Sequence, residues 1–397
     1  MKSKILVRSS LAVGGYLLYL FLGFPLIHLG YVERWLVFPD TYLKFNQPGA
    51  SKLDDDQSVA SPDAPHLFYR ADSVMMHQVR LVDSTLTNQT NVFPLRDRSK
   101  LTVECTFAEQ PHWRFSTQLK DSLRVEPTTY APAEQLLVLS DIEGNFMALR
   151  GLLLTNGVID TDYNWTFGQG HVVVLGDVFD RGVHVTECLW LLYKLEQNAE
   201  KQGGKLHFIL GNHDLMNLSG DLRYVRKKYL QNDSLMGVPY EQWYTPHTEL
   251  GRWVATKNSV ERIGDWLFAH GGVSAAVARL GLSPEAINDT CRRHYFDALD
   301  ARNQSKRIGL LFGPDGPHWY RGYVQEEASG ADVSKVLKWA KCTRMVVAHT
   351  IVRSVRSGYD NRVFLVDTPH AQGISEALLI TSQGVYRTTS TGKRTPL

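Results

Sequence analysis

Val174–Gly182, with the sequence VLGDVFDRG, ends an apolar run with two aspartates and an arginine framed by two glycines. Charged side chains at the end of a buried strand do not contribute to a hydrophobic core, so they either cap a turn or hold a ligand. Further apolar runs after residue 132 also end in polar residues: EQLLVLSDIEGN, KLHFILGNHD, WLFAHGG, RMVVAHT and RVFLVDT. The same two alternatives, a capped turn or a ligand site, therefore apply to a series of strand ends.

Helix-like segments separate the first three of these runs. FMALRGLLLTNG follows the first run, and TECLWLLYKLEQNAEKQGG, with leucines along one face and a Gly-Gly stop, follows VLGDVFDRG. Continuous Val/Leu runs that alternate with helices are typical of βαβ units with buried strands. The sequence thus predicts a layered α/β fold. Ligands in such sheets bind beyond the carboxyl ends of the strands, where the polar clusters lie.

The polar residues at these ends form a set rich in oxygen and nitrogen donors: Asp141, Glu143, Asp177, Asp180, Asn212, His213, Asp214, His270 and His349. Several buried carboxylates side by side repel one another and need a compensating cation. Mixed Asp, Asn and His ligands suit borderline divalent metals such as Mn, Fe or Zn. Each cluster alone could be a turn cap or a structural histidine. Five clusters in order, each after an apolar run, favour a metal site.

The order SDIEGN, GDVFDRG, GNHD, HGG, AHT resembles the calcineurin-like metallophosphoesterase superfamily, and GD-x-x-DRG with GNH[DE] is the signature of its phosphoprotein phosphatase branch. The segments HTELGRWVATKNSVERIGDWLFAHGGVS and LFGPDGPHWYRGY are similar to bacterial and Shewanella-like members of that branch. The resemblance covers residues 132–387. It implies a metallophosphoesterase β-sandwich flanked by helices, in a domain over residues 132–397.

The resemblance also implies roles for individual residues. Six residues would hold two divalent metal ions, with Asp177 shared by both: Asp141, Glu143, Asp177, Asn212, His270 and His349. His213 would protonate the leaving oxygen, with its ring oriented by Asp180. Arg181 would clamp the phosphate oxygens, and Arg321 in WYRG matches the family's second phosphate arginine. An imidazole held in one tautomer and planar guanidinium groups have the chemistry that these roles require.

One residue departs from the family pattern. The first motif is normally Asp-x-His, whereas this chain has Asp141-Ile142-Glu143. Three interpretations remain open: Glu143 ligates the first metal, reaches it through a water, or leaves that site weak or empty. If Glu143 ligates, all protein ligands of the first metal are oxygen atoms, which favours Mn or Mg over Zn. We therefore expect two divalent metals, with Mn most favoured and Fe, Zn or Mg as alternatives.

The N-terminal residues have a different composition. Three basic residues within the first eight precede an uncharged run from Ser9 to Val32, which is long enough to cross a membrane as a helix. An uncleaved membrane anchor over residues 1–35 is expected, and a signal peptide or a buried helix is the alternative. Basic residues before the run place the body of the protein on the extracytoplasmic (periplasmic) side.

The remaining segments are assigned by composition. Residues 36–65 are polar and rich in Pro, Asp and Ser, which predicts a linker, and short alternating runs over residues 66–131 predict a small antiparallel β-rich accessory region. Residues 219–262 form a polar insertion that is either a solvated face or a lip for an anionic substrate. Its aromatic residues either line that lip or pack the insertion: Trp243, Tyr244 and Trp253. Four scattered cysteines are expected to be buried thiols, with disulfides as the alternative.

The charge balance, 43 basic and 41 acidic residues with a net charge of +2, gives no reason to expect a nucleic-acid partner. The expected partners are a phosphorylated substrate, either a phosphoprotein or a small phosphomonoester, and the membrane. The motifs predict a protein-phosphatase-like phosphoric monoester hydrolase, in which metals activate water for in-line attack on phosphate. Two alternatives stay open: a dinucleotide polyphosphate or nucleotide hydrolase on the same metal core, and a non-catalytic relative that binds a phosphorylated ligand.

Overall fold

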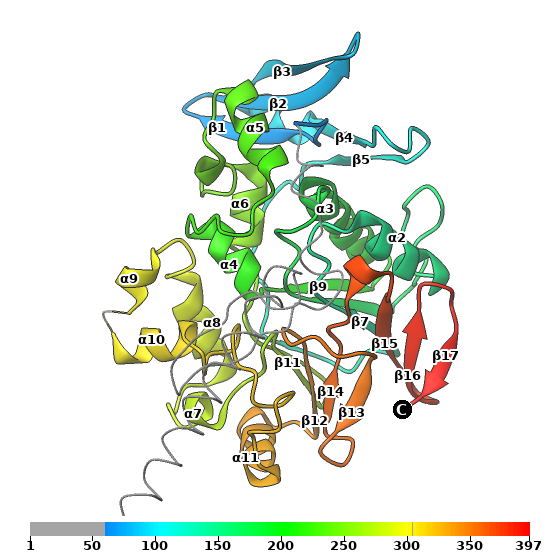
Figure 1. Ribbon diagram of the computed structural model, residues 1–397, viewed down its shortest axis with the longest axis vertical. Helices are drawn as coiled ribbons and strands as arrows, with labels where there is room; N and C mark the ends of the chain where they lie inside the picture. The colour runs from blue at the N-terminus through cyan, green and yellow to red at the C-terminus, as the bar shows by residue number, and fades with distance from the viewer. Residues whose placement is uncertain (1–59, 304) are drawn as a thin grey trace, which may run out of the picture. The chain divides into compact units, whose positions relative to one another are not determined.

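Two six-stranded sheets form the centre of the structure (Figure 1). The computed structural model describes residues 60–303 and 305–397, which form one structural unit. The first sheet has the order β17-β16-β15-β7-β8-β9, made of β7 (Gln135–Leu139), β8 (His171–Leu175), β9 (Lys205–Ile209), β15 (Glu376–Thr381), β16 (Gly384–Thr389) and β17 (Arg394–Pro396). The second has the order β13-β14-β12-β11-β10-β6, made of β6 (Thr129–Tyr130), β10 (Glu261–Ile263), β11 (Trp266–Phe268), β12 (Arg344–Val347), β13 (Arg356–Gly358) and β14 (Val363–Leu365).

The strands that lead to the polar clusters run parallel. β7, β8 and β9 are connected through the helices α2 (Phe146–Thr155) and α3 (Val185–Lys201), which confirms the predicted βαβ units. In the second sheet β11, β12 and β14 are parallel neighbours. The C-terminal strands β15, β16 and β17 extend the first sheet in antiparallel fashion beside β7, which the sequence analysis did not anticipate. A loop of two residues joins β15 to β16, which antiparallel strands permit and parallel strands do not.

The two sheets face each other across an apolar core. Val138 of β7 packs in this core with Phe268 of β11 and Val346 of β12. Its neighbours Leu137 and Leu139 point to the opposite face of the sheet and belong to the larger core that includes α2 and α3. Both faces of the first sheet are therefore covered, which explains its continuous apolar runs. The expected β-sandwich with flanking helices is present.

Residues 66–131 contain the antiparallel strands that the alternating pattern predicts. β1 (His66–Arg70), β2 (Ser73–Val82) and β3 (Thr85–Pro94) form a three-stranded sheet, and β4 (Thr102–Thr106) pairs with β5 (Arg114–Gln118). β6 lies in the same stretch of sequence but pairs in parallel with β10 and so belongs to the second sheet of the sandwich. The β-rich region and the sandwich are thus joined through β6.

β3 is an edge strand of ten residues, and none of its side chains is charged.

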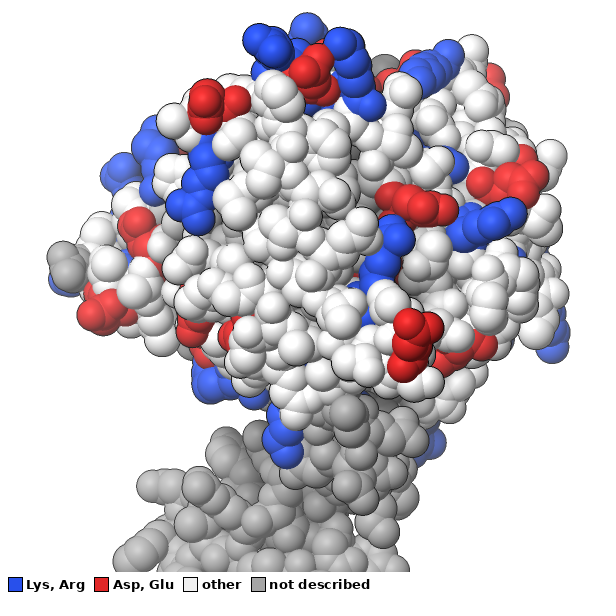
Figure 2. Space-filling model, turned by 90° about the horizontal axis from the view of Figure 1, so that it is seen from above, with Lys and Arg blue, Asp and Glu red and all other residues white. Residues whose placement is uncertain are grey.

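On the face of the molecule viewed from above, basic and acidic side chains surround a broad area without charged residues (Figure 2). This face therefore has no concentration of charge of one sign.

The predicted membrane anchor over residues 1–35 and most of the predicted linker lie outside the described residues. Within the described ranges, no helix has the length and hydropathy needed to span a membrane. The last residues of the linker are described, and Asp63 and Ala64 among them are buried. Asp63 Oδ1 lies 3.2 Å from Nζ of the buried Lys228. This end of the predicted linker is therefore part of the folded unit.

Further helices complete the described chain: η2 (Leu95–Lys100), α4 (Asn212–Leu218), α5 (Lys227–Met236), η3 (Tyr240–Gln242), α6 (Glu249–Val254), α7 (Ala275–Ala278), α8 (Pro284–Arg292), α9 (Leu299–Arg302), α10 (Lys306–Phe312), α11 (Gly330–Ala340) and η4 (His370–Gln372). The aromatic side chains of the predicted insertion, Trp243, Tyr244 and Trp253, are at most 2% exposed. They pack the insertion and do not line a lip. All four cysteines are buried and free, as expected of structural thiols: Cys105, Cys188, Cys291 and Cys342.

A buried carboxylate joins the β-rich region to the helices. Glu249, at the start of α6, is fully buried and accepts hydrogen bonds from Arg98 Nη2 at 2.7 and 2.9 Å. The hydroxyl of Tyr193 in α3 donates to Glu249 at 2.7 Å, and the hydroxyl of Tyr69 in β1 donates a further hydrogen bond. Glu249 therefore holds β1, Arg98 and α3 at one point.

Replacing Glu249 with alanine is expected to destabilise the protein by about 3–5 kcal/mol, because the largely buried Arg98 loses its countercharge. Chemical denaturation measures this difference in the free energy of unfolding. Glu200→Ala is the control, since the Glu200 side chain is 50% exposed and pairs with Lys205 at the surface. This control is expected to lose less than about 1 kcal/mol. Equal losses in the two variants would contradict the role given to Glu249.

Candidate active site

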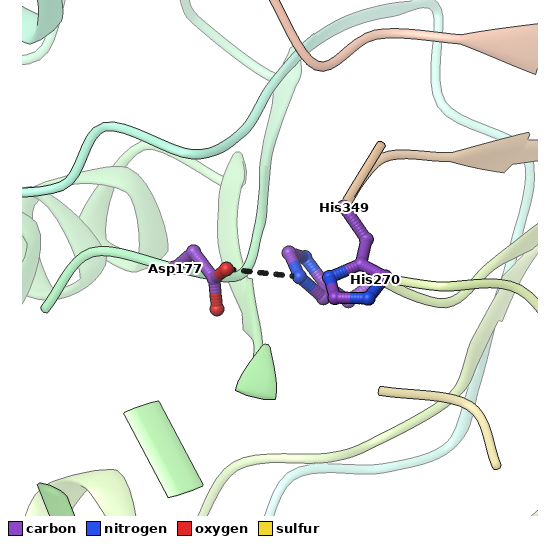
Figure 3. Close-up of side chains that lie close together, drawn as sticks. All are labelled: Asp177, His270 and His349. Carbon is purple, nitrogen blue, oxygen red and sulfur yellow. Dashed lines mark ion pairs between the residues drawn. The ribbon is translucent and has the colours of Figure 1, made fainter. Parts of the chain in front are cut away.

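The polar ends of strands from both sheets converge on one edge of the sandwich. Asp141 follows β7, Asp177 follows β8, and Asn212 begins α4 after β9. His270 follows β11 and His349 follows β12. Asp177, His270 and His349 offer ligand atoms within 4.8 Å of one another, and their side chains face one another (Figure 3). The structure thus brings together strand ends that are far apart in the sequence.

Hydrogen bonds fix the turns after β7, β8 and β9 against one another. The backbone N–H of Glu143 donates to the Asp177 carbonyl at 2.9 Å. The carboxylate of the fully buried Asp214 accepts the backbone N–H groups of Gly211 at 2.8 Å, Asp177 at 3.0 Å and Val178 at 2.9 Å. Asp214 therefore serves the geometry of the turns through backbone contacts.

Six of the ten predicted site residues have positive φ angles, between 47° and 72°: Asp141, Glu143, Asp177, Asp180, Arg181 and His349. L-residues rarely adopt this conformation, which costs about 1–2 kcal/mol per residue. Strain concentrated at one place indicates turns that are shaped to position side chains. Close packing adds a second constraint, since a Cβ on Gly211 would lie 2.1 Å from Asp177 Oδ1.

Three potential ligand atoms lie at the spacing that metal ligands adopt. His270 Nε2 is 3.1 Å from Asp177 Oδ2 and 3.1 Å from Asn212 Oδ1. His270 Nδ1 donates to the Leu175 carbonyl at 2.7 Å, which leaves Nε2 facing the two oxygen atoms. Ligands bound about 2.1 Å from one ion lie about 3 Å apart. This set therefore fits a divalent cation.

His349 adds a fourth donor to the set. Its side chain is buried, and its Nε2 atom has no hydrogen-bond partner among the described residues. Burial, followed by the neighbouring positive charges of His270 and Arg321, lowers the pKa of His349 to about 2, so the imidazole is neutral. A buried, neutral imidazole nitrogen without a partner has the lone pair that a metal requires. The donor set thus fits the metal that the motifs imply.

His270 compensates the buried negative charge at this edge. Burial alone lowers the pKa of His270, but Asp177 and Asp141 outweigh burial and raise the pKa to about 10. Burial raises the pKa of Asp141 to about 6. Two carboxylates that share one imidazolium carry an excess of negative charge, and a divalent cation can compensate it in place of the imidazolium proton.

The other half of the site contains the predicted acid and arginine. His213 Nδ1 lies 2.7 Å from Asp180 Oδ2, and Asp180 Oδ1 accepts a hydrogen bond from Asn217 Nδ2 at 2.9 Å. Burial lowers the pKa of His213, but Asp177 and Asp180 together raise it above the usual value for imidazole. Arg181 Nη2 lies 3.2 Å from His213 Nε2. Nε2 of His213, the ring nitrogen that does not contact Asp180, therefore faces the arginine.

Glu143 contacts Arg181 directly. Its carboxylate forms an ion pair with Arg181 Nη1. The same carboxylate forms another cluster of potential ligand atoms with Asp177 and His213, in which these atoms lie within 4.8 Å of one another. Glu143 is therefore within reach of both a metal position and Arg181, and the three interpretations of this residue stay open.

Two further charged residues lie at this edge. Arg321 Nη1 donates to the His349 carbonyl at 2.8 Å and to Thr350 Oγ1 at 3.0 Å, which places the predicted second arginine beside a predicted metal ligand. Asp367 follows β14 and is buried. Burial, followed by the nearby charge of Asp141, holds the pKa of Asp367 well above its usual range. Asp367 was not among the predicted site residues, although its strand end RVFLVDT carries the same signal as the others.

Tyr224 is a second residue that the sequence analysis did not select. Its ring lies 4.9 Å from the ring of His213 and 5.4 Å from the guanidinium carbon of Arg181. The residue follows no strand and lies in the basic stretch LRYVRKK. Only the path of the chain between α4 and α5 brings Tyr224 to the site, so no local pattern could have identified it.

Gly211→Ala is expected to lower the free energy of unfolding by about 1–3 kcal/mol, because the new Cβ overlaps the Asp177 carboxylate. The same variant is expected to lose most of the Mn²⁺-induced rise in Tm, which differential scanning calorimetry measures. Gly151→Ala in α2 is the matched control, since its Cβ would lie 3.5 Å from the nearest atom, Ser390 Cβ. This control is expected to be neutral or stabilising by up to about 1 kcal/mol. Equal behaviour of the two variants would show that the close approach of the turns is unimportant.

Comparison with known proteins places this site in a family. Residues 135–352 match the model of the calcineurin-like phosphoesterase family. The chain is 28% identical over 299 residues to Shewanella-like protein phosphatase 2 of Arabidopsis thaliana. The matched region covers 63% of this chain and 75% of that protein. It is 26% identical over 246 residues to Shewanella-like protein phosphatase 1 of Plasmodium berghei (strain Anka), which covers 59% of this chain and 66% of that protein.

A solved structure agrees with these sequence matches. The crystal structure of a cold-active protein-tyrosine phosphatase of a psychrophilic Shewanella species is similar with a TM-score of 0.77 and 31% identity, covering 85% of this chain and 100% of that chain. This share of the chain exceeds residues 132–397, so the likeness extends into the β-rich region, which the motif resemblance did not include. The chain belongs to the calcineurin-like phosphoesterase family and is a metal-dependent phosphatase.

Proposed function

We propose that this phosphatase hydrolyses phosphomonoesters on protein side chains, phosphotyrosine among them, and that it uses two divalent metal ions. The observation that carries the proposal is the position of His213, Asp180 and Arg181 beside the ligand set around Asp177. The relatives support the substrate class, since two are named protein phosphatases and one is named a protein-tyrosine phosphatase. The Arg181 side chain is 42% exposed, which leaves the site open to a side chain of another protein.

Two overlapping groups of residues would hold the metal ions. In the assignment that the motifs imply, the first group is Asp141, Glu143 and Asp177, and the second is Asp177, Asn212, His270 and His349. The ligand atoms of Asp177, His270 and His349 lie close together, and Glu143 lies near Asp177. When bound, two such ions acidify the attacking water and stabilise the attacking and leaving oxygens of an in-line displacement. The first group contains only oxygen donors, and we therefore propose manganese as the preferred metal.

The side chains of this protein bind the phosphate and supply the proton. Asp180 accepts the Nδ1–H of His213 and, with Asp177, favours the imidazolium form of the ring, whose Nε2–H is the proton that the leaving oxygen would take. Arg181 lies beside His213 and Arg321 lies beside His349, so the two guanidinium groups flank the ligand set. Planar guanidinium groups bind phosphate oxygens through paired hydrogen bonds. A phosphate bound by Arg181 would lie next to His213, as protonation of its ester oxygen requires.

We further propose that residues 1–35 anchor the enzyme in a membrane, with the catalytic unit on the extracytoplasmic side. The support is the uncharged run from Ser9 to Val32 and the basic residues before it. A reporter enzyme that is active only outside the cytoplasm, fused after Leu397, is expected to be active. Activity of a cytoplasm-specific reporter alone at that position would contradict this topology.

The function is tested by turnover of a phosphotyrosine peptide, a phosphoserine peptide and diadenosine tetraphosphate by the full chain with Mn²⁺. We expect turnover of the phosphopeptides, and we expect His213→Asn to lower kcat by about 10²–10⁴-fold, because the proton donor is lost. His294→Asn is the matched control, since His294 pairs with Asp297 near the surface and is expected to change the rate by less than about twofold. Turnover of diadenosine tetraphosphate but of neither peptide would contradict the proposal and indicate a nucleotide hydrolase. Unchanged turnover by His213→Asn would remove His213 from the mechanism.

The metal preference is tested by dialysis of the protein against equimolar Mn²⁺ and Zn²⁺, followed by elemental analysis. The wild type is expected to retain a larger share of Mn²⁺ than a variant with a nitrogen donor in the first group. Glu143→His, which adds a nitrogen donor to the first group, is expected to retain more Zn²⁺. Glu104→His on β4 places the same imidazole at an exposed position and is expected to behave as wild type. Active protein that is purified with stoichiometric zinc and loses activity on exchange to Mn²⁺ would contradict the proposal.

A further inference from the structure

The segment between α4 and α5 carries an aromatic ring to the proton donor. The ring of Tyr224 meets the ring of His213 at 4.9 Å, with an angle of 60° between the ring planes. The backbone N–H of Arg181 donates to the Tyr224 carbonyl at 3.1 Å, which ties this segment to the turn after β8. The position of the ring is therefore set by a backbone hydrogen bond to a residue of the site.

Tyr224 differs in exposure from the other aromatic residues of the insertion. It is 44% exposed, whereas the three predicted lip residues are at most 2% exposed. Arg223, whose Nη2 pairs with Asp221 Oδ2 at 2.6 Å, borders the ring with its guanidinium carbon 5.9 Å from the ring centroid. Aromatic rings stabilise proteins chiefly when they are buried, so a ring held at the site with much of its surface in solvent is available to a ligand.

Proton transfer determines where the leaving group of the substrate lies. A proton donor must come within about 2.6–3.2 Å of the oxygen that it protonates. The group attached to that oxygen therefore lies beside His213, within contact of the Tyr224 ring. An aromatic leaving group can stack on this ring, with centroids about 4.5–7 Å apart. The single methylene of a serine side chain offers no such face.

We propose that Tyr224 is a specificity-determining residue, whose ring is the surface on which the aromatic leaving group of an aryl phosphate monoester stacks while His213 protonates its oxygen. The inference rests on the proposed phosphatase function. In this step the oxygen of water bonds to phosphorus, the P–O bond to the aryl oxygen breaks, and that oxygen takes the Nε2 proton of His213. The proton lost by the water restores the proton of His213 through solvent, so the reaction is balanced.

The test compares two phosphopeptides of identical flanking sequence, one with phosphotyrosine and one with phosphoserine, as substrates of the full chain with Mn²⁺. Tyr224→Ala is expected to lower kcat/KM for the phosphotyrosine peptide about tenfold, mainly through a higher KM. Its effect on the phosphoserine peptide is expected to be several-fold smaller. Tyr224→Phe keeps the ring and is expected to restore the wild-type preference. Leu235→Ala on α5 removes another exposed apolar side chain of the same insertion and is the matched control.

The possible outcomes separate the inference from the function on which it rests. A selective loss on phosphotyrosine that phenylalanine rescues supports the stacking surface. Equal losses on both peptides would overturn it, because Tyr224 would then act by positioning His213 or Arg181. No loss on either peptide would also overturn it. Failure of the wild type to hydrolyse either peptide would overturn the proposed function itself, and the inference with it.

Discussion

The carboxylate of Asp177 is the contact on which the rest of the site depends. Its Oδ2 atom lies 3.1 Å from His270 Nε2, which links the first sheet to the second. Its Oδ1 atom accepts the backbone N–H of His213 at 2.8 Å, which fixes the start of α4. Asp177 is only 1% exposed, and a carboxylate buried to this degree stays ionised only beside compensating charge. The proposed metal ligands, proton donor and phosphate-binding arginine are therefore arranged around one buried negative charge.

This arrangement requires a rigid support, because the turns that carry it are unfavourable by themselves. Residues in left-handed conformations persist only where the surrounding structure holds them. Here the apolar core between the sheets fixes the strands on one side, and α2 and α3 cover the other face of the first sheet. Asp214 joins two of the turns through their backbone N–H groups, and Gly211 permits their close approach. The packing of the sandwich thus compensates for the unfavourable backbone conformations of these turns, which have no local stabilisation of their own.

The sequence predicted those features that have a local signal. An apolar run followed by a polar cluster marks a strand end wherever it occurs, so the strands before Asp141, Asp177 and His270 and their convergence could be expected without coordinates. Tyr224 could not, because its place depends on the path of a whole loop. Trp243 is buried, and β15 pairs in antiparallel fashion with β7. Both features result from long-range packing, and no periodicity in the sequence indicates them. Local patterns therefore specified the chemistry of the site, and long-range packing specified its surroundings.

The proposed dinuclear site requires that Asp177 is shared by two metal positions. Equilibrium dialysis of the wild type and of Asp177→Asn against Mn²⁺, followed by elemental analysis, tests it most directly, with circular dichroism to show that the variant is folded. Asp162→Asn, an exposed aspartate, serves as the control. We expect two ions per wild-type and control chain and fewer than one per Asp177→Asn chain. A folded Asp177→Asn protein with the metal content of the wild type, or a wild type that retains no metal, would contradict it.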